Sequence, residues 1–366
     1  MDYLREALDL ARQGQGQTSP NPAVGAVVVQ DGRIAGRGFH TWAGVKHAEI
    51  LALEQAGPAA RGATFYINLE PCAHTGRTGP CANALIEAGI ARVVAITEDP
   101  NPAVAGRGFA LLRDAGIEVV IDSRLQAEAE ELNMGFFHFM RTGRPLVTLK
   151  SAVTLDGKIA APEDNSGWIT SEAARTHVQT VRHLHDAILS GIGTVAADNP
   201  LLNDRSGLPR ARPFLRIVAD SQLRLPLDSR LVESCDNDLL VVCTSIAPPA
   251  RRAALEARGV EVIAADGPAG RPDLHRIVQI LAERRYLSLM IEAGSKLNWA
   301  ALESGIVDRI FFYYAPKILG GMQSLPVAGG LGRRSRTDAI RLEHVRLHQI
   351  TADEFAVEAW TPREAS

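Results

Sequence analysis

Hydrophobic and polar positions divide the start of the chain into short segments with helical or strand spacing. In DYLREALDLARQ the leucines and alanines recur on one face of a helix, which predicts an amphipathic helix over about residues 2–13. Two strand-like runs follow at 23–30 and 33–40. They are joined by Asp31-Gly32, and an Asp-Gly pair between two such runs predicts a β-hairpin.

After this hairpin the chain alternates between helical and strand-like segments. The expected elements are a helix at 48–55, a strand at 63–70, a helix at 82–89, a strand at 92–99, a helix near 107–115 and a strand at 119–121. A hairpin that leads into βα units is typical of an α/β layer fold. A helical run at 125–140 then ends in a basic joint with Gly and Pro, which predicts a domain boundary between residues 143 and 144.

Residues 144–366 alternate again and predict a second α/β domain. The expected elements are strands at 146–153, 187–191, 214–221, 238–245, 260–265, 288–294 and 309–319 and helices at 171–184, 249–257, 273–284 and 295–304. The segments 340–350 and 354–360 alternate polar and apolar residues, which predicts an antiparallel hairpin at a sheet edge. The two halves share no motif, so the sequence gives no support for an internal duplication.

Composition narrows the class of protein. The chain has 366 residues, of which 46% are hydrophobic, and this content suffices for folded cores. Thirty-nine basic residues against 42 acidic ones give a net charge of -3, which excludes the broad cationic surface of a general nucleic-acid binder. A local basic groove for a phosphorylated small molecule remains compatible with this charge.

Nothing in the sequence predicts a membrane-spanning or secreted protein. No stretch approaches the ~20 apolar residues of a membrane helix. Asp2 and Glu6 lie where a signal peptide has positive charge. Four cysteines in a chain of this length are too few for a disulfide scaffold. We therefore expect a soluble, cytoplasmic protein.

Three residues of the first half have the types and the order of zinc ligands. His47 lies at the start of a predicted helix, Cys72 follows a predicted strand, and Cys81 precedes the next helix. One imidazole and two thiolates leave the fourth tetrahedral position free for water, as a catalytic zinc requires. Glu49, two residues after His47, could take a proton from that water and pass it to a departing amine.

Taken one at a time, these residues are also compatible with ordinary core positions, since buried cysteines commonly act as small hydrophobes. Together, His-Ala-Glu followed by Pro-Cys matches the H-x-E…P-C-x-x-C signature of zinc nucleobase deaminases. The second cysteine, however, follows the longer insert AHTGRTGP. A purely structural zinc would need a fourth ligand, and His74 is the nearest candidate.

The segments TSPNPAVGAVVV, HAE, LEPCAHTGRTGPC and EDPNPAVAGRG closely resemble the deaminase half of the RibD family of bifunctional riboflavin-biosynthesis enzymes, whose own pattern includes the long cysteine spacing. The resemblance implies a cytidine-deaminase-like three-layer domain. This domain would bind Zn²⁺ and hydrolyse the 2-amino group off a diamino-ribosylamino-pyrimidinone 5′-phosphate. His47, Cys72 and Cys81 would be the metal ligands and Glu49 the catalytic proton shuttle. The implied substrate-binding residues are Asn21, His40, His74, Asp99 and Asn101.

Two strand-to-helix junctions of the second half could bind a dinucleotide. GIGTVA at 191–196 has the form G-x-G-x-x-A, but a Rossmann fingerprint also needs an acidic residue ~20 positions further on. Asp198 follows too closely for that role, so the string alone does not predict a Rossmann unit. The junction at 291–296 offers backbone amides at a helix N-terminus, which suit a phosphate or pyrophosphate.

The segments LKSAVTLDGKIA, SGWITS, GIGTVAADNPLLNDR, VADSQ, IEAGSKL and YYAPKILGG resemble the reductase half of the same family, so the resemblance covers about residues 2–360. It implies a dihydrofolate-reductase-like domain that uses NADPH to open and reduce the ribosyl group to ribityl. Hydride addition to the imine carbon of the open-chain sugar needs a neighbouring proton donor or cation, for which we name Lys150 and Asp198. The implied cofactor-binding residues are Ala152, Trp168, Thr194, Asp198, Ser221, Gly294, Ser295 and Lys296. The implied substrate-binding residues are Ser166, Arg182, Leu202, Arg205 and Glu292.

Several of these positions also have ordinary interpretations. Arg182 and Arg205 suit a phosphate clamp because a guanidinium binds phosphate through two parallel hydrogen bonds, but either could be a solvated surface charge. Trp168 is as compatible with a core position as with stacking on a cofactor. Asn21 and Asn101 each precede a proline, and Asn-Pro pairs commonly begin turns.

Three other interpretations of the whole chain remain open. The first is a cytidine or tRNA-adenosine deaminase, although 5% aromatics and a charge of -3 disfavour an RNA-binding surface. The second is a binding module with a purely structural zinc, which predicts unfolding on chelation. The third is decay of one domain, which the presence of every key polar residue argues against. We expect an enzyme of phosphorylated pyrimidines that forms a homo-oligomer, a dimer or a tetramer, and has no nucleic-acid or membrane partner.

Overall fold

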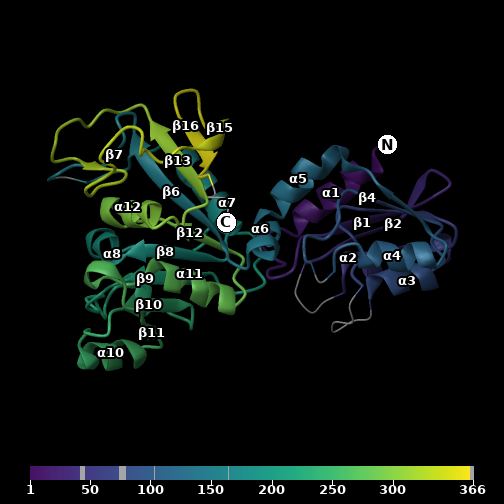
Figure 1. The fold of residues 1–366 in the computed structure, drawn as a ribbon, viewed down its shortest axis with the longest axis horizontal. Helices are drawn as coiled ribbons and strands as arrows, with labels where there is room; N and C mark the ends of the chain where they lie inside the picture. The colour runs from purple at the N-terminus through teal and green to yellow at the C-terminus, as the bar shows by residue number, and fades with distance from the viewer. Residues whose placement is uncertain (42–45, 74–79, 103, 164, 363–366) are drawn as a thin grey trace. The chain divides into compact units, whose positions relative to one another are not determined.

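The computed structural model describes residues 1–41, 46–73, 80–102, 104–163 and 165–362. The chain divides into two compact units (Figure 1). They are Met1–Gly143 with Pro209–Arg212, and Arg144–Leu208 with Pro213–Ser366. Each unit has its own central sheet and its own apolar cores.

The first unit is built around a five-stranded sheet. Its strands are β1 (Gly25–Gln30), β2 (Arg33–Phe39), β3 (Thr64–Ile67), β4 (Arg92–Ala95) and β5 (Glu118–Ile121). Its helices are α1 (Tyr3–Gln13), α2 (Ala48–Ala56), α3 (Cys81–Glu87), α4 (Arg107–Asp114), α5 (Gln126–Leu132) and α6 (Met134–Thr142), with 3-10 turns η1 (Gly57–Ala60) and η2 (Ser123–Leu125). The strand order is β2-β1-β3-β4-β5, in which β1 is antiparallel to β2 and β3 and the remaining pairs are parallel.

Helices cover both faces of this sheet and give it three layers (Figure 1). Side chains of a strand alternate between the two faces. In β1, Ala26 and Val28 pack with residues of α2, α3 and α4, whereas Val27 and Val29 pack with residues of α1. The cytidine-deaminase-like three-layer arrangement predicted for this half is confirmed.

Capping and turn residues in the sequence of the first half mark where several of its elements begin and end. The Asp2 side chain caps α1 by accepting a backbone hydrogen bond. Asp31 and Gly32 have φ of 50° and 72°, the left-handed conformation of a tight hairpin turn. The helical run predicted at 125–140 is interrupted at Asn133, whose Oδ1 accepts a hydrogen bond from the Ala23 N–H at 2.7 Å. A side chain required elsewhere thus divides one predicted helix into α5 and α6.

The second unit is built around a nine-stranded sheet. Its strands are β6 (Leu146–Thr154), β8 (Ala187–Gly191), β9 (Leu215–Ala219), β10 (Leu239–Cys243), β11 (Glu261–Ala264), β12 (Ser288–Ile291), β13 (Arg309–Ala315), β15 (Glu343–Gln349) and β16 (Phe355–Trp360), while β7 (Lys158–Ala160) and β14 (Leu325–Pro326) form a separate pair. Its helices are α7 (Glu172–His183), α8 (Ile192–Asp198), α9 (Arg230–Glu233), α10 (Pro249–Glu256), α11 (Leu274–Glu283) and α12 (Ser295–Glu303), with the 3-10 turn η3 (Pro268–Gly270).

The order of the large sheet is β11-β10-β9-β8-β12-β6-β13-β16-β15. All pairs from β11 to β13 are parallel, and β16 and β15 each run antiparallel to the preceding strand. Residues of α11 and α12 pack on one face, and residues of α7, α8, α9 and α10 pack on the other. The dihydrofolate-reductase-like fold expected for this half is confirmed.

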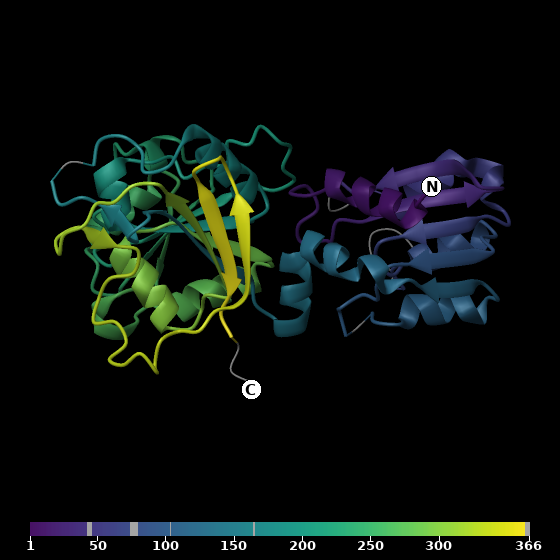
Figure 2. The ribbon, with the colours of Figure 1, turned by 90° about the horizontal axis from the view of Figure 1, so that it is seen from above.

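The predicted antiparallel hairpin at the sheet edge is confirmed as β15 and β16 (Figure 2). Sequence periodicity missed β7, α8, α9 and β14, which have between two and seven residues and are too short to show a period. No helix in the described part of the chain is long and apolar enough to cross a membrane.

Candidate active sites

The position of α2 on the sheet fixes the first candidate site. A Cβ atom at Gly36 or Gly38 of β2 would lie 2.1 or 2.2 Å from a carbonyl oxygen of α2. Any larger residue would therefore push α2 away from the sheet. His47 is the N-cap residue of α2 and Glu49 lies in its first turn, so this close packing sets the position of both.

His47, Cys72 and Cys81 come together at the N-termini of α2 and α3. His47 Nδ1 lies 3.2 Å from Cys81 Sγ and 3.8 Å from Cys72 Sγ, and all three ligand atoms lie within 4.8 Å of one another. Tetrahedral zinc with ordinary bond lengths separates a nitrogen from a sulfur ligand by about 3.6 Å. The group therefore fits Zn²⁺ with one coordination position left. Among the described residues no fourth His, Cys, Asp or Glu joins the group.

The local hydrogen bonds favour a thiolate at Cys72. The Cys81 backbone N–H donates to Cys72 Sγ at 3.3 Å. The hydrogen bond with the Cys81 thiol, supported by the one with His47, lowers the pKa of Cys72 to about 4 against the opposing effect of burial. Because metal ions bind the deprotonated thiol, this environment favours a metal bond at Cys72, whereas the hydrogen bond with Cys72 and burial raise the pKa of Cys81.

Glu49 lies beside the ligands without being one of them. Its side chain is buried, and burial raises the pKa of Glu49 although nearby His47 opposes the rise. A buried carboxylate next to a metal site can accept a proton and return it to a leaving group. The geometry is thus compatible with the predicted role of Glu49 as a proton shuttle.

Two predicted substrate residues lie at the same cluster. The ring of His40 is buried, and its centroid lies 5.2 Å from that of His47 in an edge-on arrangement. Asn21 Nδ2 lies 3.4 Å from His40 Nε2. Burial, followed by the charge of His47, lowers the pKa of His40 to about 4, so this imidazole is neutral at pH 7.

The other predicted substrate residues of this half lie between β4 and α4 or outside the described part. The Asn101 N–H donates to Asp99 Oδ1 at 2.8 Å, and the Asp99 N–H donates to Glu70 Oε2 at 3.1 Å. Glu70, which the sequence analysis did not select, comes two residues before Cys72 and links this loop to a metal ligand. The sequence signal for it was present in LEPC, but its partners are distant along the chain. His74 lies outside the described residues.

The second candidate site is a buried cluster of three charged side chains. Lys150 of β6 places Nζ 3.3 Å from Oε2 of Glu292, which directly follows the neighbouring strand β12. Arg182 of α7 donates from Nε to Oε1 at 2.6 Å and from Nη2 to Oε2 at 2.9 Å. These side chains are only 10 to 15% exposed.

The charges of this cluster change the acidity of its members. Burial opposes ionisation of Glu292, but the combined attraction of Lys150 and Arg182 outweighs it and lowers the pKa of Glu292 to about 2. Burial lowers the pKa of Lys150, while Glu292 opposes this effect. Lys150 is therefore a stronger acid than an exposed lysine, as suits a proton donor.

The predicted phosphate clamp has different immediate partners in the structure. Glu292 occupies the fork of Arg182, whose Nη1 also donates to the Asn203 carbonyl oxygen at 2.9 Å. Arg205 is exposed, and its backbone N–H donates to the Gln179 side chain at 3.0 Å. Arg205 is thus the more accessible of the two for a phosphate, and the clamp stays a prediction.

Two further predicted residues are placed differently from what their roles would suggest. Asp198 is exposed at the end of α8, and within the described residues no ion pair joins it to Lys150, whose partner is Glu292. Leu202 is buried in an apolar core and has a positive φ of 50°. Only the backbone of Leu202 could therefore meet a substrate.

Two junctions with predicted cofactor residues lie side by side because β8 and β12 are paired. A Cβ atom at Gly294, the N-cap of α12, would lie 3.5 Å from Thr194 Oγ1 of α8. The neighbouring Ser295 is buried, and its hydroxyl has no hydrogen-bond partner in the described part of the chain. Buried polar groups normally have partners, and a helix N-terminus offers backbone N–H groups, so this position could hold a polar group of a dinucleotide. Lys296 is exposed next to it.

The remaining predicted contacts differ in exposure. Ala152 of β6 and Ser221 after β9 are half-buried, and Ser166 is exposed. Trp168 is 68% exposed with the Arg175 guanidinium carbon 4.8 Å from its ring centroid, so Trp168 is not a core residue. Its exposed indole is available for stacking.

Tyr313 and His177 are polar neighbours of Lys150 that the sequence analysis missed. Lys150 Nζ lies 5.7 Å from the centroid of the buried Tyr313 ring. The Tyr313 hydroxyl forms a hydrogen bond of 2.7 Å with His177 Nδ1. Strand alternation in RIFFYYA could suggest that Tyr313 lies on an inner face, but it gives no indication of Lys150 as its neighbour.

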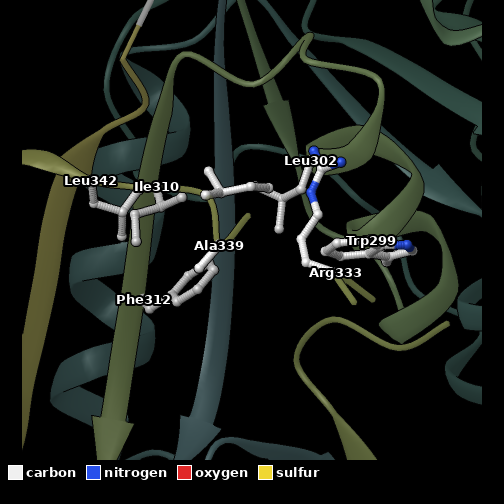
Figure 3. A pocket seen from close by; sticks show the side chains of 8 residues that line it. Trp299, Leu302, Ile310, Phe312, Arg333, Ala339 and Leu342 are labelled. Atoms are coloured by element: carbon white, nitrogen blue, oxygen red, sulfur yellow. The ribbon is translucent and has the colours of Figure 1, made fainter. Parts of the chain in front are cut away.

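A largely apolar hollow of the second unit lies outside both candidate sites (Figure 3). It is lined by Trp299, Leu302, Ile310, Phe312, Arg333, Ala339, Ile340 and Leu342. Arg333 lies beside Trp299 and extends toward Leu302, with its guanidinium carbon 5.9 Å from the centroid of the indole ring. None of the lining residues is a predicted site residue, and none supplies a group for proton transfer at pH 7.

Comparison with known proteins identifies a family for each half of the chain. Residues 1–97 match the cytidine and deoxycytidylate deaminase zinc-binding region, and residues 145–354 match the RibD C-terminal domain. The riboflavin biosynthesis protein RibD of Actinobacillus pleuropneumoniae is 46% identical over 343 residues, which cover 94% of this chain and 90% of that protein.

Two solved structures are similar to this chain over nearly its whole length. RibD of Acinetobacter baumannii has a TM-score of 0.88 and 36% identity, over 99% of this chain and 98% of that one. A diaminohydroxyphosphoribosylaminopyrimidine deaminase/5-amino-6-(5-phosphoribosylamino)uracil reductase of Thermotoga maritima has a TM-score of 0.83 and 36% identity, over 98% of each chain. With the His47, Cys72 and Cys81 cluster in one unit and a reductase fold in the other, the chain belongs to the RibD family of riboflavin-biosynthesis proteins.

Proposed function

We propose that this chain catalyses two reactions of riboflavin biosynthesis on one phosphorylated pyrimidine. The first is zinc-dependent deamination of 2,5-diamino-6-ribosylamino-4(3H)-pyrimidinone 5′-phosphate. The second is NADPH-dependent reduction of the ribosyl side chain, which gives 5-amino-6-ribitylamino-uracil 5′-phosphate. The convergence of His47, Cys72 and Cys81 beside the buried Glu49 is the observation that carries this proposal.

We assign the deaminase to residues 1–143 and the reductase to residues 144–366. The three candidate zinc ligands and Glu49 all lie in the first of these segments. The Lys150, Glu292 and Arg182 cluster lies in the second. The site in residues 1–143 suits proton transfer beside a metal ion. The site in residues 144–366 suits proton delivery to the nitrogen of a reduced carbon–nitrogen bond. Each segment therefore has the groups for one reaction.

In the deaminase, hydrolysis adds water to the ring carbon that holds the amino group, breaks its bond to nitrogen and releases ammonia. Zn²⁺, when bound by His47, Cys72 and Cys81, lowers the pKa of a water molecule and so supplies the nucleophile. Glu49 accepts the proton of that water and returns it to the leaving nitrogen. The neutral His40 and Asn21 face the pyrimidine, and His74, Asp99 and Asn101 complete the substrate-binding set.

In the reductase, NADPH, when bound, would supply a hydride for the imine carbon of the open-chain sugar. The electron pair of the carbon–nitrogen double bond moves to nitrogen, which takes a proton from Lys150. Glu292 holds Lys150 Nζ in place, and the fork of Arg182 in turn holds Glu292. Asp198 orients the sugar hydroxyls.

The remaining contacts of the reductase are those that the resemblance to the RibD family implies. Residues proposed to bind the substrate are Ser166, Arg182, Leu202 through its backbone, Arg205 and Glu292. Residues proposed to bind NADPH are Ala152, Trp168, Thr194, Asp198, Ser221, Gly294, Ser295 and Lys296. The unpartnered hydroxyl of Ser295 at the N-terminus of α12 supports this side of the site most directly.

We also propose that the chain acts in the cytoplasm as a homo-oligomer. All four cysteines are free, and two thiols that bind zinc must stay reduced, which suits a reducing compartment. The strand β15 ends the large sheet, and its Val345 and Leu347 are 59% and 71% exposed. Pairing of this edge with a second copy would cover it. Light scattering should then give a multiple of 39.3 kDa, whereas the mass of one chain contradicts the proposal.

The central experiment follows both reactions in one cuvette. Zinc-replete protein is mixed with the diamino-ribosylamino-pyrimidinone phosphate and NADPH, and ammonia release and NADPH absorbance are recorded together. We expect ammonia first and NADPH oxidation after it. Ammonia without NADPH oxidation would contradict the reductase assignment. If folded, metal-loaded protein gives neither signal, the proposed substrate is wrong.

A further inference from the structure

The first unit contains a second buried glutamate whose role the deamination chemistry does not explain. Glu70 follows β3, is 3% exposed and precedes the metal ligand Cys72 by two residues. In the described part of the chain no lysine, arginine or histidine forms an ion pair with it. A buried carboxylate without a cation is costly unless hydrogen bonds compensate its charge.

Four backbone N–H groups provide this compensation. Glu70 Oε2 accepts hydrogen bonds from Asp99 N at 3.1 Å and Gly106 N at 2.9 Å. Glu70 Oε1 accepts from Gly108 N at 2.8 Å and Phe109 N at 3.2 Å. The first two donors belong to the loop between β4 and α4, and the last two belong to the first turn of α4.

One carboxylate therefore connects both ends of the loop that contains Asp99 and Asn101. It also caps α4, whose own N-cap residue, Gly106, has no side chain for this purpose. The Asn101 N–H bonds to the Asp99 side chain at 2.8 Å, so both proposed substrate residues depend on the loop path that Glu70 fixes.

The segment that contains Glu70 is fixed from several sides. A Cβ atom at Gly108 would lie 2.0 Å from the Pro71 carbonyl oxygen, so α4 lies directly against the residue between Glu70 and Cys72. The Glu70 N–H donates to the Thr97 carbonyl oxygen at 3.0 Å. The Cys72 carbonyl oxygen accepts from the N–H of Ala82 in α3 at 3.2 Å.

We infer that Glu70 is a positioning residue of the deaminase, which sets the loop with Asp99 and Asn101 at a fixed place relative to the zinc ligand Cys72. The inference rests on the proposed contact of that loop with the pyrimidine substrate. Only a carboxylate of this length meets all four donors. Glutamine would present an NH₂ group to two of the N–H groups, and aspartate is one methylene too short to reach both pairs.

The test is Glu70→Gln in the full-length, zinc-loaded enzyme, with Glu87→Gln on the exposed side of α3 as the matched control. We expect one zinc per chain and unchanged NADPH oxidation of the deaminated intermediate. The KM of deamination should rise about tenfold or more, and kcat should change less, because buried N–H groups lose their acceptor. An unchanged KM with zinc retained overturns the inference. Loss of zinc together with a proportional loss of kcat also overturns it, because that pattern indicates a general structural role.

A double-mutant cycle separates this inference from the proposed function on which it rests. If Glu70 acts through the loop, adding Glu70→Gln to Asp99→Ala should raise KM by less than Glu70→Gln does alone, since the two changes remove one coupled unit. Full additivity overturns the inference. An unchanged KM in Asp99→Ala alone instead contradicts the proposed substrate contact of Asp99, whatever Glu70→Gln does.

Glu70→Asp provides the test if Glu70→Gln does not fold. It keeps the charge but cannot reach all four donors, so we expect retained zinc and a deamination KM above that of the wild type, by less than about tenfold. A wild-type KM in Glu70→Asp overturns the inference.

Discussion

Each unit buries a glutamate at its candidate site, and the two are compensated in different ways. Glu70 receives four backbone N–H groups, whereas Glu292 is paired with the side chains of Lys150 and Arg182. Backbone donors do not titrate and belong to the chain path itself, so they fix a loop. Side-chain cations can move and exchange protons, so they place charge near reacting atoms. On the proposed mechanism, the carboxylate of the first unit fixes a loop, and that of the second unit holds the proton donor Lys150.

The two sites also differ in what they need to be complete. The first site consists of one imidazole and two thiols, from His47, Cys72 and Cys81. When both thiols ionise, the group has two negative charges and no positive side chain to balance them. Lys150, Glu292 and Arg182 contain both signs of charge. The first site should therefore depend on an added metal, and the second should not.

Removal of zinc should have the largest effect and should separate the two units. A chelator is expected to abolish ammonia release while NADPH oxidation of the deaminated intermediate continues, because the candidate ligands all lie in the first unit. Both rates are measured before and after zinc is restored. Far-UV circular dichroism is the control, since the interpretation of a purely structural zinc requires the first unit to unfold.

The substitution Glu49→Gln should leave the metal in place and remove the proton shuttle. We expect deamination to fall by about 10²–10⁴-fold, the usual contribution of a general acid–base, with one zinc per chain and normal reduction. Ammonia release and metal content are the measurements. Glu54→Gln, exposed on the same helix, is the matched control. Deamination near the wild-type rate would exclude Glu49 as the shuttle.

The substitution Lys150→Ala should reverse this pattern. NADPH oxidation is expected to fall by at least about 10²-fold, because the proposed proton donor is lost, while ammonia release continues. Lys158→Ala in β7 serves as the control, since Lys158 Nζ donates to the Ser324 carbonyl oxygen at 3.3 Å and is not part of the cluster of charged side chains around Glu292. If both activities disappear together, the assignment of one reaction to each segment is wrong.

The smallest expected effect concerns the stability of the second unit. Glu292→Gln leaves Lys150 and Arg182 buried without their anion and should lower the free energy of unfolding by about 3 kcal/mol at pH 7. The folded pKa of Glu292 is about 2, below its ordinary 4.5, so its contribution is present above pH 4.5 and is lost as pH falls toward 2. Urea unfolding at several pH values should show the two proteins converge across this window. Glu303→Gln, exposed on α12, is the control, and a difference that does not depend on pH would contradict the role of the charge.

Local patterns predicted most elements of both units. The Asp31-Gly32 turn and α1 needed only a few neighbouring residues for their prediction, since turn conformation and helix amphipathicity repeat over short distances. The same reasoning failed at Asn133, where the side chain bonds to Ala23, 110 residues away. It also missed short elements such as β14, whose two residues pair with a distant strand.

Among the predicted site residues, too, local patterns indicate the residue type but not the contacts made with distant parts of the chain. The types and order of His47, Cys72 and Cys81 were sufficient to predict a metal site. Arg182 was predicted as part of a phosphate clamp, and only the fold could show that Glu292 occupies its fork. Leu202 was predicted as a substrate contact, yet its side chain lies in the core.

By itself the sequence determined the two-part α/β organisation, the candidate zinc ligands and the family resemblance, because these depend on residue types and short spacings. Only the tertiary structure decided which groups compensate the buried charges. Glu70 meets donors 29 to 39 residues away, and Lys150 meets Glu292 across 142 residues. Such pairs form only when strands from distant parts of the chain become neighbours in a sheet, and no local pattern specifies that neighbour.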